Sequence, residues 1–319
     1  MTKPCCLLAA VLVLAGAGCR DDSLPPREGY IPVAGGRIWY QVVGEGTGTP
    51  LLLVHGGPGG TSCGMTPLKA LGDERQVIFY DQLGTGRSDR TSDSTLWKTP
   101  RFLDEIDSIR SHLKLDRLHL YGRSWGGSVV AEYLITRQPQ GIVSAVLASP
   151  LISTSQWIAD ADTLRMELPA ELQRVLAQHE SAGTFEAPEY LAATDSFYAR
   201  FMSRKQPPVR FPECEGVTGN DTIYRYMWGP TEFVATGNLK TFERAERLRE
   251  ITVPVLFITG EFDEARPPTV RGFHQQVPGS EFEIIEGSGH SLEKDNPEQV
   301  LRVLRNWLRG VEKGSGTED

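Results

Sequence analysis

The sequence predicts an α/β protein, in which a mostly parallel sheet of eight strands is flanked by helices and carries an inserted, mainly helical cap domain. Three observations support this fold class. Short apolar runs that end at glycines recur along the chain, as expected of strands buried on both faces. Stretches with helical spacing of apolar residues lie between several of these runs. The alternation stops over residues 153–239 and then resumes, which indicates an insertion.

The composition is that of a folded, acidic chain. Of its 319 residues, 39% are hydrophobic and 23% are charged, which is enough to bury a large core. The formal net charge of -8 disfavours nucleic acid as a partner, because phosphate binding needs a basic face. The sequence shows no Cys-x-x-Cys pair and no cluster of His and Cys, so we expect no metal site.

Residues 1–19 have the pattern of an export signal. One lysine precedes the apolar stretch "LLAAVLVLAGAG", which is short for a membrane span, and polar residues follow it. Its small residues fit either cleavage after Ala17 or a lipoprotein box before Cys19, and we favour lipidation of Cys19. We therefore expect an exported bacterial protein, periplasmic or anchored to a membrane through Cys19, with a soluble secreted form as the alternative.

The core elements fall in residues 28–152 and 240–312. "YIPVAGGRIWYQVVGEG" alternates about a Gly-Gly turn and predicts a hairpin. Six further runs predict short strands: "LLLVHGG", "QVIFYDQ", "RLHLYGRS", "IVSAVLAS", "VPVLFITGE" and "FEIIEG". Thr99 followed by Pro100 marks the start of a helix. Between the two core segments, residues 153–239 hold helical, aromatic and proline-containing stretches without a convincing strand, and we assign them to the cap.

Two loop sequences and a pair of cysteines give weaker indications of function. In "HGGPGG", directly after the strand "LLLV", glycines let main-chain N–H groups approach a partner, as in a tight turn, a phosphate cradle or an oxyanion hole. "YDQLGTGRSD", residues 81–89 with the preceding tyrosine, is interpreted as a structural strand and turn at the entrance. A disulfide between Cys63 and Cys214 is possible, and nothing in the sequence selects it.

The strongest chemical signal is a serine between a strand and a helix. Gly122, Ser124 and Gly126 form G-x-S-x-G in "LHLYGRSWGGSVVAEYL". The glycines permit a sharp turn that lifts Ser124 above the edge of the sheet. The turn also aims the N–H of Trp125, at the start of the helix, toward a reacting carbonyl oxygen. This context predicts a nucleophile.

A serine nucleophile needs a base and an acid that orients it. His290 follows a strand and two glycines in "EGSGHS", so it is expected at the same sheet edge as Ser124. We expect His55 to order the glycine loop and the other four histidines to lie at the surface, as listed here: His112, His119, His179 and His274. Asp263 ends the run "VPVLFITGEFD". Ser124, Asp263 and His290 then follow the α/β-hydrolase order.

Taken together, "HGGPGG", "YDQLGTGRSD", "GRSWGG", "MWGPTEF", "GEFDEARP" and "GSGHS" resemble the proline iminopeptidase family of α/β hydrolases, which are serine aminopeptidases and related amino-acid amidases. The resemblance covers roughly residues 28–308. It implies an oxyanion hole formed by the N–H groups of Gly57 and Trp125. It also implies that Glu232 and Glu264 bind the α-ammonium of the substrate, a role that a carboxylate pair suits chemically. An alternative is that both glutamates are solvated or helix-terminal acids.

We therefore expect a serine aminopeptidase that releases an N-terminal residue, preferably proline, through an acyl-enzyme intermediate and without a cofactor. Its substrates are expected to be short peptides or amino-acid amides with a free N-terminus. The alternative is an amino-acid amidase or esterase on the same fold without a strict free-amine requirement. A non-catalytic binding protein is disfavoured by the complete set of Ser, Asp and His. Haloalkane and epoxide hydrolases carry an aspartate nucleophile, where this chain has Ser124.

Overall fold

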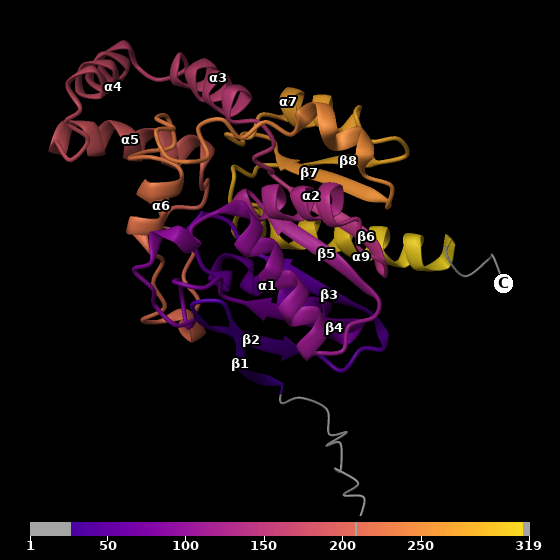
Figure 1. Cartoon of the computed structure of the whole chain (residues 1–319). Coiled ribbons are helices and arrows are strands. Elements are labelled where there is room, and N and C mark those ends of the chain that lie inside the picture. Colours follow the sequence, from indigo (N-terminus) through magenta and orange to yellow (C-terminus); the bar gives the residue numbers. More distant parts are fainter. Residues whose placement is uncertain (1–26, 208, 315–319) are drawn as a thin grey trace, which may run out of the picture.

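The computed structural model describes residues 27–207 and 209–314. Eight strands form one sheet in the order β1-β2-β4-β3-β5-β6-β7-β8 (Figure 1). β1 and β2 pair antiparallel with their neighbours, and β3 to β8 run parallel. The mostly parallel eight-stranded sheet predicted from the sequence is confirmed. The strands are β1 (Glu28–Val33), β2 (Gly36–Val43), β3 (Gly48–Val54), β4 (Arg75–Tyr80), β5 (Leu118–Arg123), β6 (Ile142–Ala148), β7 (Val255–Gly260) and β8 (Glu281–Ile285).

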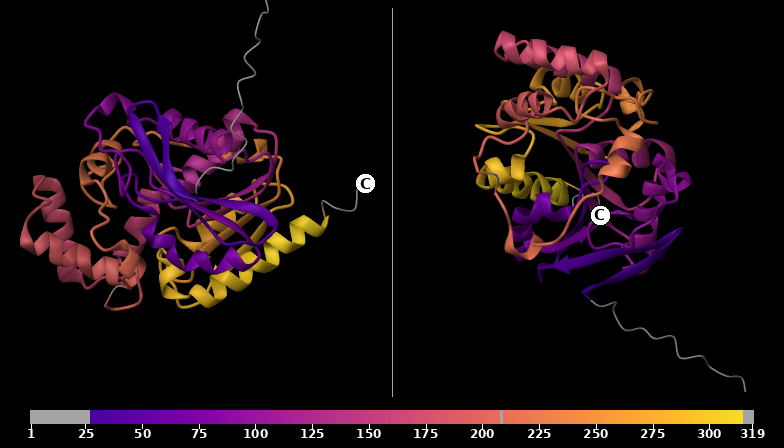
Figure 2. Two further views of the ribbon diagram at one scale, coloured as in Figure 1. Left: turned by 90° about the horizontal axis from the view of Figure 1, so that it is seen from below. Right: turned by 90° about the vertical axis from the view of Figure 1, so that its left-hand side faces the viewer.

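Helices cover both faces of the sheet, as the two layers beside it in Figure 2 show. Alternate residues of each central strand point to opposite faces, so Leu52 packs into one apolar cluster and Leu51 into the other. The first face is covered by α1 (Thr99–His112), α2 (Trp125–Arg137) and α7 (Pro267–His274). The second face is covered by η1 (Ser62–Asp73), α8 (Leu292–Asp295) and α9 (Pro297–Gly314). The remaining short turns of the core are η2 (Ser94–Leu96) and η4 (Ala245–Glu250).

The cap is a group of helices inserted in the chain between β6 and β7, beside the carboxyl edge of the sheet. It contains α3 (Thr154–Arg165), α4 (Ala170–Ala182), α5 (Pro188–Phe201), η3 (Pro212–Cys214) and α6 (Asp221–Met227). Figures 1 and 2 show α3, α4 and α5 projecting to one side of the core. These helices enclose an apolar cluster of their own that includes Tyr190, Phe197 and Phe233. A bridge between Ser153 and Glu243 closes the base of the insertion.

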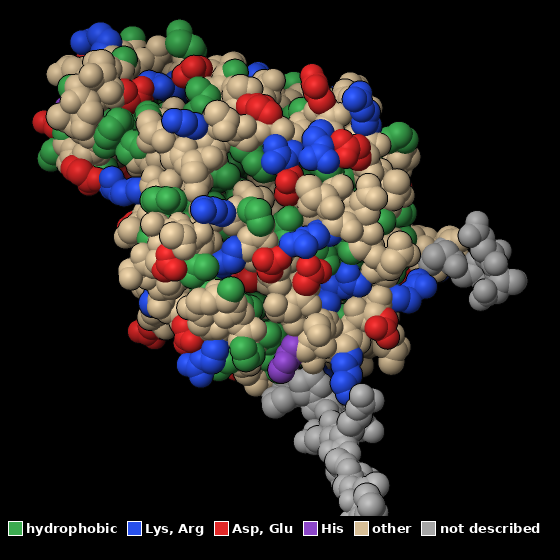
Figure 3. All heavy atoms as spheres, viewed as in Figure 1, with side chains coloured by type: hydrophobic (Ala, Val, Ile, Leu, Met, Phe, Trp, Pro, Cys, Tyr) green, Lys and Arg blue, Asp and Glu red, His purple; other side chains and the backbone are tan. Residues whose placement is uncertain are grey.

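Two sequence-based expectations concern segments outside this core. The export signal and Cys19 lie outside the described residues and stay predictions. In the part of the chain that is described, none of the helices combines the length and apolar character needed to cross a membrane. Lys and Arg are intermingled with Asp and Glu over the face seen in Figure 3.

The prediction that His119 lies at the surface is wrong. His119 is fully buried, because β5 is a central strand whose two faces are both covered by helices. Its Nδ1 lies 2.7 Å from Ser144 Oγ, and its Nε2 lies 3.2 Å from Glu312 Oε1 on α9. Burial lowers the pKa of His119 to about 4, so the ring is neutral near pH 7. This histidine therefore fastens α9 to the sheet.

Candidate active site

Ser124 occupies a strained turn between β5 and α2. Its φ and ψ of 54° and -122° are rare for a residue with a side chain. Neighbouring glycines make the turn possible, because a Cβ on Gly126 would lie 2.0 Å from the carbonyl oxygen of Val54. A Cβ on Gly122 would lie 2.4 Å from the carbonyl oxygen of Gly126. The turn places Ser124 at the carboxyl edge of the sheet, at the N-terminus of α2.

The glycine loop, residues 55–60, passes beside this serine. A Cβ on Gly56 would lie 3.1 Å from Ser124 Cβ and 3.6 Å from its Oγ. Gly57 has a φ of 129°, in the region that favours glycine. His55 holds the loop, because its Nε2 accepts a hydrogen bond of 2.9 Å from the N–H of Gln82. Its Nδ1 is therefore the donor to Gly56 O at 2.8 Å, which leaves His55 in the loop-ordering role predicted for it.

His290 and Asp263 meet at the same edge. His290 Nδ1 lies 2.8 Å from Asp263 Oδ1, and both side chains are buried. The cap holds the histidine loop from above, because the main-chain N–H of His290 donates to Phe201 O at the end of α5, at 2.8 Å. The sequence-predicted acid and base are thus brought together, with Nε2 left facing away from Asp263.

Asp263 is enclosed by hydrogen-bond donors. Oδ1 also accepts from Ala265 N at 2.9 Å, and Oδ2 accepts from Gly260 N at 3.0 Å and from the hydroxyls of Ser149 and Thr259. Burial by itself would raise the pKa of Asp263, but His290 and these donors outweigh it and hold the pKa below its usual value. The carboxylate is therefore ionised and fixed in orientation, as an acid that orients a histidine must be.

Glu264 lies on the other side of the histidine. Its side chain is 2% exposed, and Oε1 is 3.8 Å from His290 Nε2. Neither carboxylate oxygen has a hydrogen-bond partner among residues 27–207 and 209–314. Burial, together with the charges of Glu232 and Asp263, raises the pKa of Glu264 well above its usual value. A buried carboxylate without a hydrogen-bond partner is suited to a cationic ligand.

Glu232 approaches this group from the cap. Its Oε1 accepts a hydrogen bond of 2.6 Å from the hydroxyl of Tyr224 on α6. Burial raises the pKa of Glu232, while Tyr224 and His290 act in the opposite direction. The two glutamates that the family resemblance singled out are therefore close enough to influence each other's charge, and the charge of His290 also acts on Glu232.

Two aromatic residues of this site were missed from the sequence. The ring of Trp157 on α3 meets the His290 ring edge-on, with centroids 5.6 Å apart. Tyr224 donates the hydrogen bond to Glu232 that is described above. Both lie in the cap, where no local motif marks them. Only the aromatic character of the cap helices could have suggested that they form part of the site.

The strand-and-turn segment of residues 81–89 has the structural contacts predicted for it. Asp81 is buried, and its Oδ1 accepts from both the N–H and the hydroxyl of Ser62, each at 2.8 Å. Its Oδ2 accepts from the N–H of Arg87 at 2.9 Å. Asp81 thereby ties this turn to the start of η1, next to the glycine loop.

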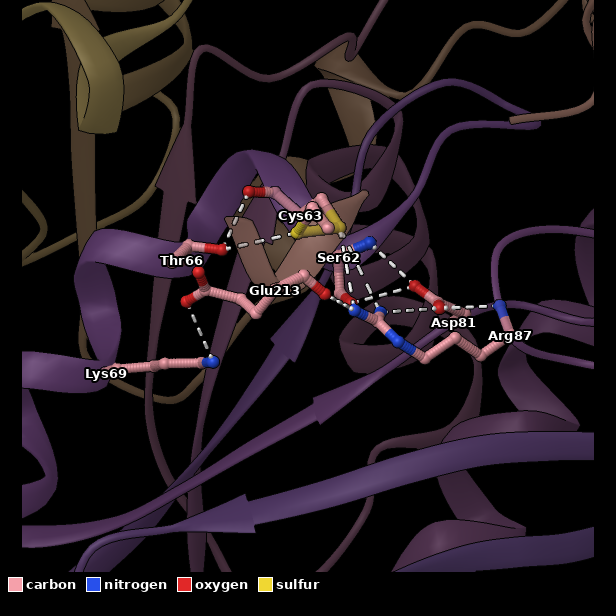
Figure 4. The surroundings of a disulfide bond; sticks show 8 residues. Ser62, Cys63, Thr66, Lys69, Asp81, Arg87 and Glu213 are labelled. Carbon is pink, nitrogen blue, oxygen red and sulfur yellow. Dashed lines mark hydrogen bonds and ion pairs between the residues drawn. A yellow bond between two sulfur atoms is a disulfide. The ribbon is translucent and has the colours of Figure 1, made fainter. Parts of the chain in front are cut away.

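A disulfide joins Cys63 and Cys214, the pairing that the sequence left open. Figure 4 shows it among Ser62, Asp81 and Arg87 of the core. The guanidinium of Arg87 donates to Glu213 O in the cap at 2.9 Å, so polar contacts accompany the covalent link. The bridge connects η1 with η3.

This geometry defines an α/β hydrolase. Its serine lies in the sharp turn between β5 and α2, the nucleophile elbow, and its histidine is hydrogen-bonded to an aspartate. A sequence model of the alpha/beta hydrolase fold matches residues 49–297, in agreement with the sheet order. More distant solved structures support the fold alone, such as an esterase from Thermogutta terrifontis with 21% identity over 90% of this chain and 99% of that one, and a TM-score of 0.62.

Relatives of higher identity identify the family. A proline iminopeptidase of Heyndrickxia coagulans is 40% identical, over 89% of this chain and 99% of that protein. One from Clostridium botulinum is 36% identical, over 88% of this chain and 97% of that protein. The crystal structure of proline iminopeptidase from Mycobacterium smegmatis has a TM-score of 0.82 and 34% identity, over 90% of this chain and 99% of that chain. The chain belongs to the proline iminopeptidase family.

Proposed function

We propose that the protein is a serine aminopeptidase that releases an N-terminal residue, preferably proline, from short peptides or amino-acid amides with a free N-terminus. The observation that carries this proposal is Glu264, a buried carboxylate without a hydrogen-bond partner in the described chain, 3.8 Å from the ring of His290. An esterase needs no such group. The names of the family relatives support the same activity.

In the proposed reaction Ser124 is the nucleophile and His290 is the general base. His290 Nδ1 donates to the ionised Asp263, so Nε2 is the nitrogen that takes the proton of Ser124 as its Oγ attacks the carbonyl. His290 then gives this proton to the departing amine, and the acyl group stays on Ser124. Water attacks the acyl-enzyme in the second half, with His290 again as base. Asp263 stabilises the imidazolium that forms in each half.

We assign the oxyanion hole to the main-chain N–H groups of Gly57 and Trp125. Trp125 opens α2, where the helix dipole favours negative charge, and the glycine loop passes beside Ser124. Gly57 has a positive φ, and a Cβ there would lie 2.5 Å from Gly60 N, so the loop conformation that presents its N–H requires glycine. These donors stabilise the tetrahedral intermediate more than the substrate, which is the requirement for rate acceleration.

The α-ammonium of the substrate is assigned to Glu232 and Glu264. A positive charge between them relieves their mutual repulsion and lowers the pKa of both, so binding is coupled to the release of a proton. The two carboxylates also determine how many substrate residues fit between the bound amine and Ser124. A residue with its amine held there places only the first peptide bond at Ser124, which makes the enzyme an exopeptidase.

The test is a matched panel of substrates. We expect arylamides of free proline to be cleaved with a kcat/KM at least about tenfold higher than their N-acetyl forms, since acetylation removes the charge that the glutamates bind. Ser124→Ala, the control for contaminating activity, should lose several powers of ten in kcat. Equal rates for free and acetylated substrates would instead favour the amidase or esterase alternative. Panel members with other first residues measure the preference for proline.

We also propose that Cys19 is lipidated and anchors an exported protein to a membrane. The sequence "AGAGC" at the end of the apolar stretch supports this proposal. Mass spectrometry of the mature N-terminus is the measurement. An acylated Cys19 is the expected result, whereas an unmodified N-terminus at Gly18 would reject the lipid anchor.

A further inference from the structure

The Cys63–Cys214 disulfide joins two segments that are distant in the sequence, one next to the glycine loop and one in the cap. Cys63 is the second residue of η1, three residues after the glycine loop, and Cys214 ends η3 in the cap. The two Cα atoms are 6.0 Å apart, although 151 residues separate them in sequence. The disulfide therefore connects the cap with the segment that follows the glycine loop, to which one N–H of the oxyanion hole is assigned.

The chain that follows Cys214 packs directly on the core glycines. We call residues 214–224 the docking segment. The N–H of Asn220 donates to Gly59 O at 2.8 Å, and its side-chain amide donates to Gly84 O at 2.9 Å. A Cβ on Gly59 would lie 2.6 Å from Asn220 O, and one on Gly219 would lie 2.7 Å from Gly59 O. Glycine at these positions is what lets the cap lie so close to the loop.

The docking segment links the glycine loop to Glu232, one of the two carboxylates of the site. The side chain of Asn220 caps α6 by accepting from Thr222 N and Ile223 N. Tyr224 lies one turn further and donates to Glu232 Oε1 at 2.6 Å. The position of Glu232 relative to the glycine loop therefore depends on how α6 packs on that loop.

We propose that the Cys63–Cys214 disulfide is a positioning element for substrate selection, holding α6 on the glycine loop and so fixing the distance between the amine site and the oxyanion site. This inference rests on the proposed function. Release of a single N-terminal residue requires this distance to match one substrate residue. A loosened docking segment then weakens binding of the ammonium, while Ser124, His290 and Asp263 keep their places in the core.

The bridge is open to a small reductant. Both cysteines are half-buried and line a cavity of about 620 Å³. A dithiol reduces the disulfide by exchange: it gives two electrons and two protons to the sulfur pair, which becomes two thiols, and is itself oxidised to a cyclic disulfide. After reduction, only noncovalent contacts hold the docking segment, such as those of Asn220 and Arg90 with the facing backbone.

The experiment compares two arylesters with the same leaving group. One is the ester of proline and the other is the ester of cyclopentanecarboxylic acid, which has the same ring size but no amine. The ratio of their kcat/KM values isolates the contribution of the ammonium. We expect this ratio to fall about fivefold or more, mainly through KM of the proline ester, when the protein is reduced or carries Cys63→Ser with Cys214→Ser. Reoxidation of the wild type should restore it.

The controls separate positioning from stability. Partial unfolding lowers both kcat/KM values alike and leaves the ratio unchanged. Glu213→Gln removes the exposed ion pair between Lys69 and the residue beside Cys214 but keeps the disulfide, so its ratio should stay within about twofold of the wild type. Should the double variant not fold, the reduced wild type, with circular dichroism as a check on its fold, gives the same comparison.

Two results overturn the inference. One is an unchanged ratio in protein whose mass shows Cys63 and Cys214 reduced. The other is a mass showing both thiols free in protein purified without reductant. A ratio near one in the oxidised wild type is a different outcome, because it contradicts the proposed aminopeptidase function itself and the inference falls with it.

Discussion

Asp263 and Glu264 are consecutive in the chain and have opposite surroundings. Asp263 accepts hydrogen bonds from backbone and side-chain donors that hold it ionised, and it pairs with His290. Glu264 is equally buried, yet its oxygens lack hydrogen-bond donors in the described structure and its pKa is raised. A buried carboxylate without hydrogen-bond donors destabilises the free enzyme when it is ionised, which is the expected consequence of reserving it for a cationic substrate.

Replacement of Glu264 with Gln should therefore stabilise the fold at high pH. A carboxyl whose folded pKa is raised favours the fold while protonated, and this contribution is lost as pH rises through the folded pKa. We expect Glu264→Gln to raise the free energy of unfolding by about 1–3 kcal/mol at pH 8 and to have little effect at pH 4. Urea denaturation at both pH values measures this.

The exposed Glu281 on β8 offers a matched control for that measurement. Glu281→Gln should change the free energy of unfolding by less than about 0.5 kcal/mol at either pH. If Glu264→Gln destabilises the fold at pH 8 as much as at pH 4, the carboxylate has a partner and the account of this residue is wrong.

The turn between β5 and α2 shows how backbone packing makes an active site possible. Ser124 keeps a positive φ because Gly122, Gly126 and Gly127 let β5, α2 and the neighbouring chain approach more closely than any side chain allows. A Cβ on Gly127 would lie 2.7 Å from Pro150 Cβ, after β6. The sharp turn at Ser124 therefore depends on the close packing of β3, β5 and α2.

Gly126→Ala should disrupt this elbow. Its Cβ would lie 2.0 Å from the carbonyl oxygen of Val54, so β3 or α2 must shift. We expect a loss of about 1–3 kcal/mol or more in the free energy of unfolding and a large fall in kcat. Gly272→Ala in α7 is the control, because a Cβ there meets nothing within 4 Å and alanine favours helix, by about 0.5–1 kcal/mol. Equal effects of the two substitutions would contradict the packing argument.

At the scale of the whole molecule, two buried histidines that stay uncharged near neutral pH make the stability of the fold depend on pH. His119 joins β5 to α9 and has a pKa of about 4, below its ordinary value. The unfolded chain therefore binds a proton at a pH where the folded chain does not, and stability falls as the pH drops from about 6.5 to about 4. His55 in the glycine loop has a lowered pKa for the same reason, burial.

His119→Gln should reduce this acid sensitivity. Glutamine keeps a polar side chain near Ser144 and Glu312 but takes up no proton. We expect the plot of unfolding free energy against pH to become shallower between pH 6.5 and 4, by up to about 1.4 kcal/mol per pH unit, although the variant is less stable at pH 7. An unchanged slope would show that other groups dominate acid unfolding.

The sequence predicted those parts of the molecule that depend on local pattern. Alternation and apolar runs located all eight strands, and G-x-S-x-G with strand-end residues located Ser124, Asp263 and His290. What it missed depends on contacts between distant segments. The burial of His119 follows from the sheet order, and Trp157 and Tyr224 reach the site only because the cap folds over it. The cysteines likewise carry no local sign of their partner.

The central claim is that Glu232 and Glu264 bind a charged amine while Ser124 attacks the neighbouring carbonyl. The pH dependence of kcat/KM tests it most directly, with a series of aminoacyl arylamides whose amines differ in pKa. The account predicts that activity falls above the pKa of each substrate's own amine, around pH 8 for an ordinary α-amino group, and that this alkaline limb moves with the substrate. An alkaline limb at one fixed pH for every substrate, with N-acetylated forms cleaved equally well, would contradict the claim.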